Sequence, residues 1–296
     1  MSLHLRSELL GHGFSDDELR TLRRHGALHH VRRGAYVHGP PPDDVVDAHV
    51  LRIRAAQEYL SDQVVVSHVS AAVLHRLPIW GLSLDRVDVT RPGRCRGGRR
   101  GRLVHVRTNT LDPAETVEID GIRRTSLERT VVDLGRAVPF TQAVVIADAA
   151  HAREAWDREL AWGVLAQMRR WPGAPRARRV LEFADGLSES VGESRSRVLM
   201  AIAGLPTPVL QWRVSGTPHR CDFAWPEAGV VGEFDGRVKY GRLLRPGQEP
   251  GDVVFQEKIR EDEIRATDRT VVRWTWADLD AFAPVAARLR ARLGRA

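Results

Sequence analysis

Gly-Val-Val-Gly-Glu-Phe-Asp, residues 229–235, has the composition of a buried β-strand that carries two acids near its end. Successive side chains of a strand point to opposite faces, so Glu233 and Asp235 are expected on the same face. Glu and Asp are poor strand formers, and their pairing among Val and Phe therefore calls for a functional reason. The pattern predicts a strand that presents two carboxylates from one face of a sheet.

The residues around this strand predict a small α/β domain over 186–296. A helix is expected at about 191–203, and strands are expected at 209–214, 220–225 and 229–235. A charged loop, a helix at about 254–266, a strand at 271–276 and a terminal helix follow. If residues 226–229 close a hairpin, Asp222 lies near Glu233, and Glu193 stands near the start of the first helix. Four acids then converge on one point.

Such a convergence of acids is unfavourable without a cation. Two like charges about 4 Å apart repel by roughly 4 kcal/mol at an effective dielectric near 20. A bound Mg²⁺ or Mn²⁺ removes this repulsion, and Mg²⁺ prefers oxygen ligands. The acids therefore predict a divalent-cation site suited to hydrolysis of a phosphodiester bond. The alternative is a set of solvent-facing acids on an ordinary sheet.

The order of these residues resembles the PD-(D/E)xK nucleases, the restriction-endonuclease-like superfamily, and within it the group related to very-short-patch repair endonucleases. The resemblance covers residues 188–280 and is carried by Asp222, by Glu233-Phe234-Asp235-Gly236, and by Val271-Val272-Arg273-Trp274-Thr275-Trp276. It implies Asp222, Glu233 and Asp235 as metal ligands, with Glu193 as a fourth catalytic acid.

Two departures from that motif concern the catalytic cation. Asp235 stands where the superfamily usually has a lysine, and Lys239 stands where the subgroup often has a histidine. An anion cannot offset charge on the transition state, so another lysine is expected to do so. Lys258 is preferred over Lys239, because a predicted helix positions it while Lys239 follows a turn.

Residues 1–40 predict a small DNA-binding unit. Ser15 and Glu18 have the spacing of a helix capping box, and a strand pair follows with Arg32, Arg33 and Gly34 at its turn. A helix followed by a basic hairpin is typical of a winged helix. Only about fourteen residues precede the capped helix, so the unit is expected to be a truncated version.

Residues 41–185 predict a mixed α/β middle domain with a basic loop. Helices are expected at 43–60, 67–77, 126–135, 140–153 and 178–185, and strands at 87–89 and 103–106. The segment 91–102 holds six arginines, four glycines and no acid. It is predicted either to bind nucleic-acid phosphates or to be a solvated hairpin tip. The arginines proposed for phosphate contact are Arg94, Arg96, Arg99, Arg100 and Arg102, together with Arg32 and Arg33.

The N-terminal two thirds also resemble AbiEi-type antitoxins, which pair a winged helix with a mixed α/β domain. The motifs that carry this resemblance are loose and lie at 25–36, 67–72 and 121–134. They imply DNA and a cognate toxin or antitoxin protein as partners. His68 and His75 lack a third ligand at fitting spacing, and the sequence therefore favours a structural role over a metal site for both.

The composition agrees with a folded protein that meets an anionic partner. The chain has 296 residues with 43% hydrophobic and 28% charged residues, a net charge of +7 and a pI near 10.3. Such an excess favours DNA, although a GC-rich genome that encodes Arg in place of Lys gives the same figures. No segment is apolar enough to span a membrane, no signal peptide is seen at the start, and a cytoplasmic protein is expected.

The sequence thus predicts an α/β (mixed α+β) protein of three parts, 1–40, 41–185 and 186–296. Its predicted function is that of a Mg²⁺- or Mn²⁺-dependent DNA endonuclease in a defence or toxin–antitoxin setting. One alternative is a non-catalytic DNA-binding regulator of the antitoxin kind with a degenerate nuclease domain. Another is a surface for a partner protein.

Overall fold

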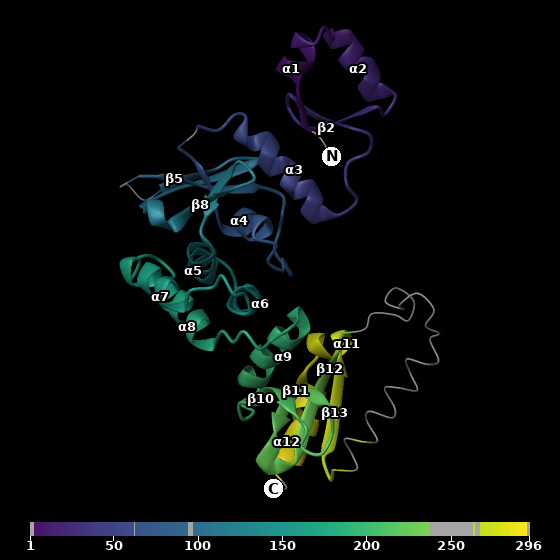
Figure 1. Ribbon diagram of the computed structural model, residues 1–296, viewed down its shortest axis with the longest axis vertical. Helices are drawn as coiled ribbons and strands as arrows, with labels where there is room; N and C mark the ends of the chain where they lie inside the picture. The colour runs from purple at the N-terminus through teal and green to yellow at the C-terminus, as the bar shows by residue number, and fades with distance from the viewer. Residues whose placement is uncertain (1–2, 62, 94–96, 237–262, 264–266, 295–296) are drawn as a thin grey trace. The chain divides into compact units, whose positions relative to one another are not determined.

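The computed structural model describes residues 3–61, 63–93, 97–236, 263 and 267–294, and shows a mixed α/β protein (Figure 1). It divides into two compact units. Unit 1 comprises Met1–Ile146 and Ala155–Glu182, and unit 2 comprises Ala147–Glu154 and Phe183–Ala296. Among the described residues, no helix combines the length and the hydropathy that crossing a membrane requires.

Unit 1 begins with a small sheet and two helices. The elements are β1 (Leu3–Leu5), α1 (Arg6–Gly11), α2 (Asp16–Arg24), β2 (Leu28–Arg32) and β3 (Ala35–His38), and the sheet order is β1-β3-β2. Ser15 caps α2 through the capping box read from the sequence, and β2 pairs with β3 as expected. A short helix, α1, precedes the capped helix, and the truncated winged helix stays a prediction.

The centre of unit 1 is a six-stranded sheet in the order β6-β7-β5-β4-β9-β8. One face of it is apolar, because Val87 and Val89 on β5 pack with Ile53 and Ala56 of helix α3. The strands are β4 (Val65–Val66), β5 (Val87–Pro92), β6 (Gly97–Arg100), β7 (Val104–Asn109), β8 (Thr116–Ile119) and β9 (Ile122–Thr125).

Helices lie between and after these strands in the chain, and one of them carries a buried charged network. They are α3 (Val45–Gln57), α4 (His68–Leu74), α5 (Leu127–Ala137), α6 (Phe140–His151), α7 (Arg158–Gln167) and α8 (Ala174–Phe183). Arg129 on α5 is 1% exposed; it pairs with Glu115, and its Nε lies 2.9 Å from Asp133 Oδ2. The predicted helices at 43–60, 67–77, 126–135 and 140–153 are confirmed within a few residues.

The segment expected to be a basic loop is partly a strand, so that prediction was wrong. Arg91 and Pro92 end β5, and residues 97–100 form β6, which pairs antiparallel with β7. Arg94 and Arg96 lie outside the described residues. Glycine residues allow the close approach of β6 to β7, since a Cβ on Gly98 would lie 2.5 Å from the carbonyl oxygen of Val106.

Unit 2 contains a four-stranded sheet in the order β10-β11-β12-β13. The first three strands are antiparallel, and β13 joins β12 in parallel. The elements are α9 (Val191–Ile202), β10 (Val209–Arg213), β11 (Arg220–Trp225), β12 (Val230–Asp235), β13 (Thr270–Thr275), α11 (Trp276–Asp280) and α12 (Ala283–Leu293). All four predicted strands are confirmed. The helix expected at 254–266 falls almost wholly outside the described residues.

One apolar core holds the sheet of unit 2 against its helices. Phe223 and Trp274 from the strands pack with Met200 of α9 and Leu289 of α12. The indole N–H of Trp274 donates to Ser196 Oγ at 2.7 Å, which satisfies the polar atom of a buried ring. Trp225 and Trp274 are buried, as expected for core residues. The polar residues of β11 and β12 are not part of this apolar core.

Candidate functional site

The candidate site lies on the two central strands of the four-stranded sheet in unit 2 (Figure 1). β11 and β12 pair with Phe223 opposite Gly232, and continuing this register by one residue places Asp222 opposite Glu233. On the other side of β12, Arg273 of β13 is the Cα partner of Glu233. A row of charged residues therefore crosses three adjacent strands.

Asp222 is fixed by the backbone of the neighbouring strand. Its Oδ2 accepts a hydrogen bond of 2.8 Å from the N–H of Phe234. The bond replaces a ladder hydrogen bond at the place where the pairing of β11 and β12 ends. The hairpin predicted through residues 226–229 is confirmed, because Pro226–Ala228 form a 3₁₀ turn and Gly229 is left-handed at φ 61°. The approach of Asp222 to β12 follows from that turn.

Glu233 is a buried carboxylate with a cationic neighbour. Its side chain is 8% exposed, and its Oε2 lies 2.9 Å from both Nε and a terminal nitrogen of Arg273. A buried carboxylate without such compensation would be strongly destabilising. Arg273 was not singled out from the sequence. The signal was available in the strand Val-Val-Arg-Trp at 271–274, where an arginine interrupts an apolar run.

Glu193 is held as a helix cap and is joined to β10. Its Oε1 accepts from Ser190 Oγ at 2.7 Å, and its Oε2 accepts from Gln211 Nε2 at 2.8 Å and from the N–H of Glu189 at 3.0 Å. Burial, which outweighs these hydrogen bonds, raises the pKa of Glu193. The Ser-x-x-Glu spacing of 190–193 would have indicated this role. A catalytic role for Glu193 stays a prediction.

The remaining predicted site residues are less well placed. Asp235 ends β12 and is exposed, with Thr275 as its Cα partner on β13. Lys239 and Lys258, proposed as catalytic cations, both lie outside the described residues. Within the described part of the chain, no three His, Cys, Asp or Glu side chains form a group able to hold a metal ion. The expected convergence of four acids therefore stays a prediction, with Asp222 and Glu233 as its adjacent pair.

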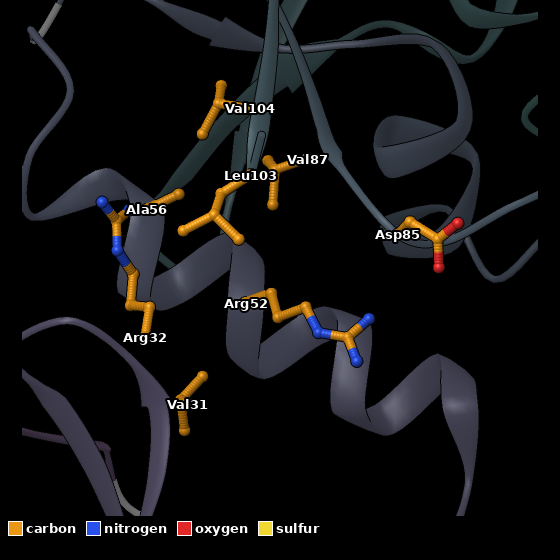
Figure 2. Close-up of a pocket in the computed structure, with 8 residues that line it drawn as sticks. All are labelled: Val31, Arg32, Arg52, Ala56, Asp85, Val87, Leu103 and Val104. Atoms are coloured by element: carbon orange, nitrogen blue, oxygen red, sulfur yellow. The ribbon is translucent and has the colours of Figure 1, made fainter. Parts of the chain in front are cut away.

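The basic residues predicted to meet DNA divide into two kinds. Arg33 is exposed at the turn between β2 and β3. Arg32 instead turns toward α3, where its guanidinium donates to the carbonyl of Ala55 at 3.3 Å and lies 4.5 Å from the centre of the Tyr59 ring. Figure 2 shows Arg32 beside Ala56 in a small hollow that Val87, Leu103 and Val104 also line. Arg32 thus supports the contact between β2 and α3.

Arg99, Arg100 and Arg102 are exposed, and the strand pairing separates the first two. Arg100 is the Cα partner of His105 and Arg99 that of Val106. Because side chains alternate along a strand, Arg100 shares a face with His105, and Arg99 points to the other face. Neighbouring arginines of one segment therefore meet different surroundings.

No family model matches the chain. Two uncharacterized proteins of Mycobacterium tuberculosis, MT2308 of strain CDC 1551 / Oshkosh and Rv2248 of strain H37Rv, are each 33% identical over 138 residues, which is 46% of this chain and 49% of theirs. The chain thus spans about half the length of these curated relatives. A crystal structure of the RV2827C protein from Mycobacterium tuberculosis is similar with a TM-score of 0.42 and 17% identity, over 71% of this chain and 78% of that one, too distant a likeness to carry an argument.

Proposed function

We propose that unit 2 is a metal-dependent endonuclease domain that hydrolyses phosphodiester bonds in DNA. The observation that carries the proposal is the hydrogen bond from the N–H of Phe234, the residue next to Glu233 in the chain, to Asp222 Oδ2, which holds Asp222 of β11 against β12. Two carboxylates on adjacent central strands are electrostatically unfavourable and need compensation. The ion pair from Arg273 to Glu233 and the hydrogen bond from the N–H of Phe234 to Asp222 supply part of this compensation.

The donor chemistry of these residues fits a hard divalent cation. Carboxylate oxygens are the ligands that Mg²⁺ takes in proteins, commonly one or two of them with several waters. Asp222 and Glu233 would hold Mg²⁺ or Mn²⁺, with Asp235 as a third donor. When bound, such an ion polarises the phosphoryl oxygen and lowers the pKa of the attacking water. Arg273 orients Glu233, and the N–H of Phe234 orients Asp222.

DNA is the proposed substrate because of the charge of the chain as a whole. A net charge of +7 attracts a polyanion. Exposed Arg33, Arg99 and Arg102 offer sequence-independent contacts to phosphates. A defence or toxin–antitoxin setting, with a cognate partner protein, belongs to the same proposal.

A second candidate function is a non-catalytic DNA-binding regulator with a degenerate nuclease domain. The observation that favours it is the Arg273–Glu233 ion pair, because a guanidinium can neutralise the acid without any metal. Asp235 at the place of the motif lysine points the same way. The two candidates make opposite predictions for the role of divalent cations.

The deciding experiment incubates supercoiled plasmid with the full chain in Mg²⁺, in Mn²⁺ and in EDTA. Nicking or cutting is expected only with a divalent cation. Asp222→Asn and Glu233→Gln, which keep the size of each side chain, are expected to abolish it. Glu227→Gln is the matched control, because Glu227 is exposed in the turn between the same two strands. Cutting that survives EDTA or survives Glu233→Gln contradicts the proposal.

A further inference from the structure

The polar face of the six-stranded sheet in unit 1 carries a cationic hollow. The side chains of Arg86, Asp88, Arg100, His105, Arg107 and His68 line this hollow of about 180 Å³, which is partly open to solvent. The strand register explains the gathering, because Asp88 pairs with His105, and His105 also pairs with Arg100. Side chains that alternate with the apolar Val87, Val89 and Val106 therefore meet on one face.

Positive charge is in excess in this hollow. Three arginines face one aspartate, which leaves two positive charges over. Asp88 is 9% exposed, and its Oδ1 lies 2.5 Å from a terminal nitrogen of Arg107 and 3.2 Å from His105 Nδ1. Asp88 thus neutralises Arg107. The Nε–H of Arg86 donates to the carbonyl oxygen of Gly101 at 3.1 Å. A surplus of clustered guanidinium charge favours an anionic ligand.

The histidines give the hollow a neutral, strained wall. Burial lowers the pKa of His68 to about 4, and burial followed by the charge of Arg107 lowers that of His105. His68 also has φ 51°, a left-handed conformation that is uncommon outside glycine. Strained residues of this kind concentrate at ligand sites. The backbone strain at His68 is therefore a second, independent mark of a binding site.

We propose that this hollow binds the phosphate group of a nucleotide. Guanidinium groups match phosphate oxygens with paired hydrogen bonds, and arginine is favoured wherever phosphate is recognised. Val69 and Leu134 also line the hollow and provide apolar surface for the remainder of the ligand. A free mononucleotide and a nucleic-acid strand share this chemistry. The site lies within unit 1, so it stands or falls independently of the nuclease proposed for unit 2.

The test is calorimetric titration of the full chain with inorganic phosphate, with a 5′-mononucleotide and with a short DNA duplex. Arg86→Ala and Arg100→Ala are each expected to weaken phosphate or mononucleotide binding at least about tenfold, since each removes a charge-assisted hydrogen-bond donor. Arg91→Ala is the matched control: Arg91 is an exposed arginine of β5, and the alternation of side chains along the strand puts it on the other face of the sheet from Asp88. Circular dichroism checks that each variant is folded.

The arms of this titration also distinguish the source of the phosphate. A mononucleotide that binds more tightly than the duplex identifies a free nucleotide as the ligand. A duplex that binds more tightly, and that loses affinity in Arg86→Ala as well as in Arg100→Ala, identifies a nucleic-acid strand. The proposal is overturned if none of the three probes binds, or if Arg91→Ala weakens phosphate binding as much as Arg100→Ala does.

Discussion

The two sheets of this protein carry clustered charges of opposite sign: mainly cations in unit 1 and acids in unit 2. In unit 1, β5 and β7 alternate apolar residues with Asp88, His105 and Arg107, so the apolar face forms the core and the other face gathers cations. In unit 2, the central strands carry Asp222 and Glu233. On the two proposals made above, the sheet of unit 1 binds an anion and the sheet of unit 2 binds a cation.

The degree of compensation separates structural charges from functional ones. Arg129 in unit 1 is almost fully buried between Glu115 and Asp133, and Arg136 also pairs with Asp133, so these charges form one network. Arg273 in unit 2 is 29% exposed where it pairs with Glu233. The Arg129 network is expected to stabilise the fold, and the Arg273–Glu233 pair is expected to take part in catalysis. The predictions below test this difference.

The largest expected effect is on stability, from Arg129→Met. This change keeps the apolar length of the side chain, removes the cation beside the buried Glu115, and leaves Asp133 paired with Arg136 alone. Breaking a buried pair in this way costs about 3 to 5 kcal/mol. Urea unfolding measures the loss.

Arg178→Met is the matched control for Arg129→Met, because Arg178 and Glu182 form an exposed pair on α8. Exposed pairs one helical turn apart contribute only about 0.3 to 0.5 kcal/mol. Equal losses in the two variants would show that the buried network of Arg129 has no special structural role.

The next effect concerns the pH dependence of unit 1. His68 has its pKa lowered to about 4, chiefly by burial, with Asp133, Asp88, Arg107 and Arg129 as the charged groups around it. Between pH 6.5 and about 4 the unfolded chain binds a proton at His68 that the folded chain does not. Stability is therefore lost as the pH falls through this window, by about 3 kcal/mol, since one pKa unit corresponds to 1.36 kcal/mol.

His68→Asn tests this assignment, because Asn tolerates the left-handed backbone and does not titrate. Thermal unfolding in phosphate-free buffer should show a flatter pH dependence for the variant between pH 6.5 and 4. His12→Asn, at an exposed position, should leave the slope as it is in the natural chain. An unchanged slope in His68→Asn would assign the acid sensitivity of unit 1 to its carboxylates.

Local sequence patterns predict most helices and strands of this fold. The features that they do not predict depend on pairing between residues far apart in the chain. The capped helix after Ser15, the helix of α3 and the hairpin of β11 and β12 follow from capping, periodicity and turn residues within a few positions of each other. The Val-Asp-Val-Thr and Val-His-Val-Arg patterns at 87–90 and 104–107 predict strands. Neither pattern indicates that the two strands pair in parallel and in this register, so the sequence did not predict the hollow.

The same limit applies to the candidate site in unit 2. The acids Asp222 and Glu233 were found because they lie on strands joined by a short turn. Arg273 was not, because β13 pairs with β12 across more than thirty residues of chain. The turning of Arg32 onto Tyr59 was also missed, since a basic residue beside a turn gives no local sign of which partner it will find.

The smallest of these effects is expected from Arg273→Ala. Its effects on the cleavage rate and on the stabilisation by Mg²⁺ decide between the two candidate functions. If unit 2 is a nuclease, Arg273 positions Glu233 and keeps a cation beside the reacting phosphate. Its loss should then lower metal-dependent cleavage by about a hundredfold, or roughly 2.7 kcal/mol in activation free energy. Arg273→Lys should restore part of the rate, because a lysine keeps the charge but not the paired geometry.

Arg288→Ala is the control for Arg273→Ala, because the guanidinium of Arg288 donates to the carbonyl of Arg273 and so supports the same strand through its backbone. It should leave the cleavage rate within about twofold of the natural chain, since substitutions away from buried features usually change free energies by no more than about 0.5 kcal/mol.

The competing role for Arg273 is that of a substitute for the metal. In that case Arg273→Ala exposes Glu233 to divalent cations, and Mg²⁺ should raise the melting temperature of the variant more than that of the natural chain while no cleavage appears. A variant that cleaves as fast as the natural chain and gains no stability from Mg²⁺ would exclude both roles and leave the Arg273–Glu233 pair as a structural contact.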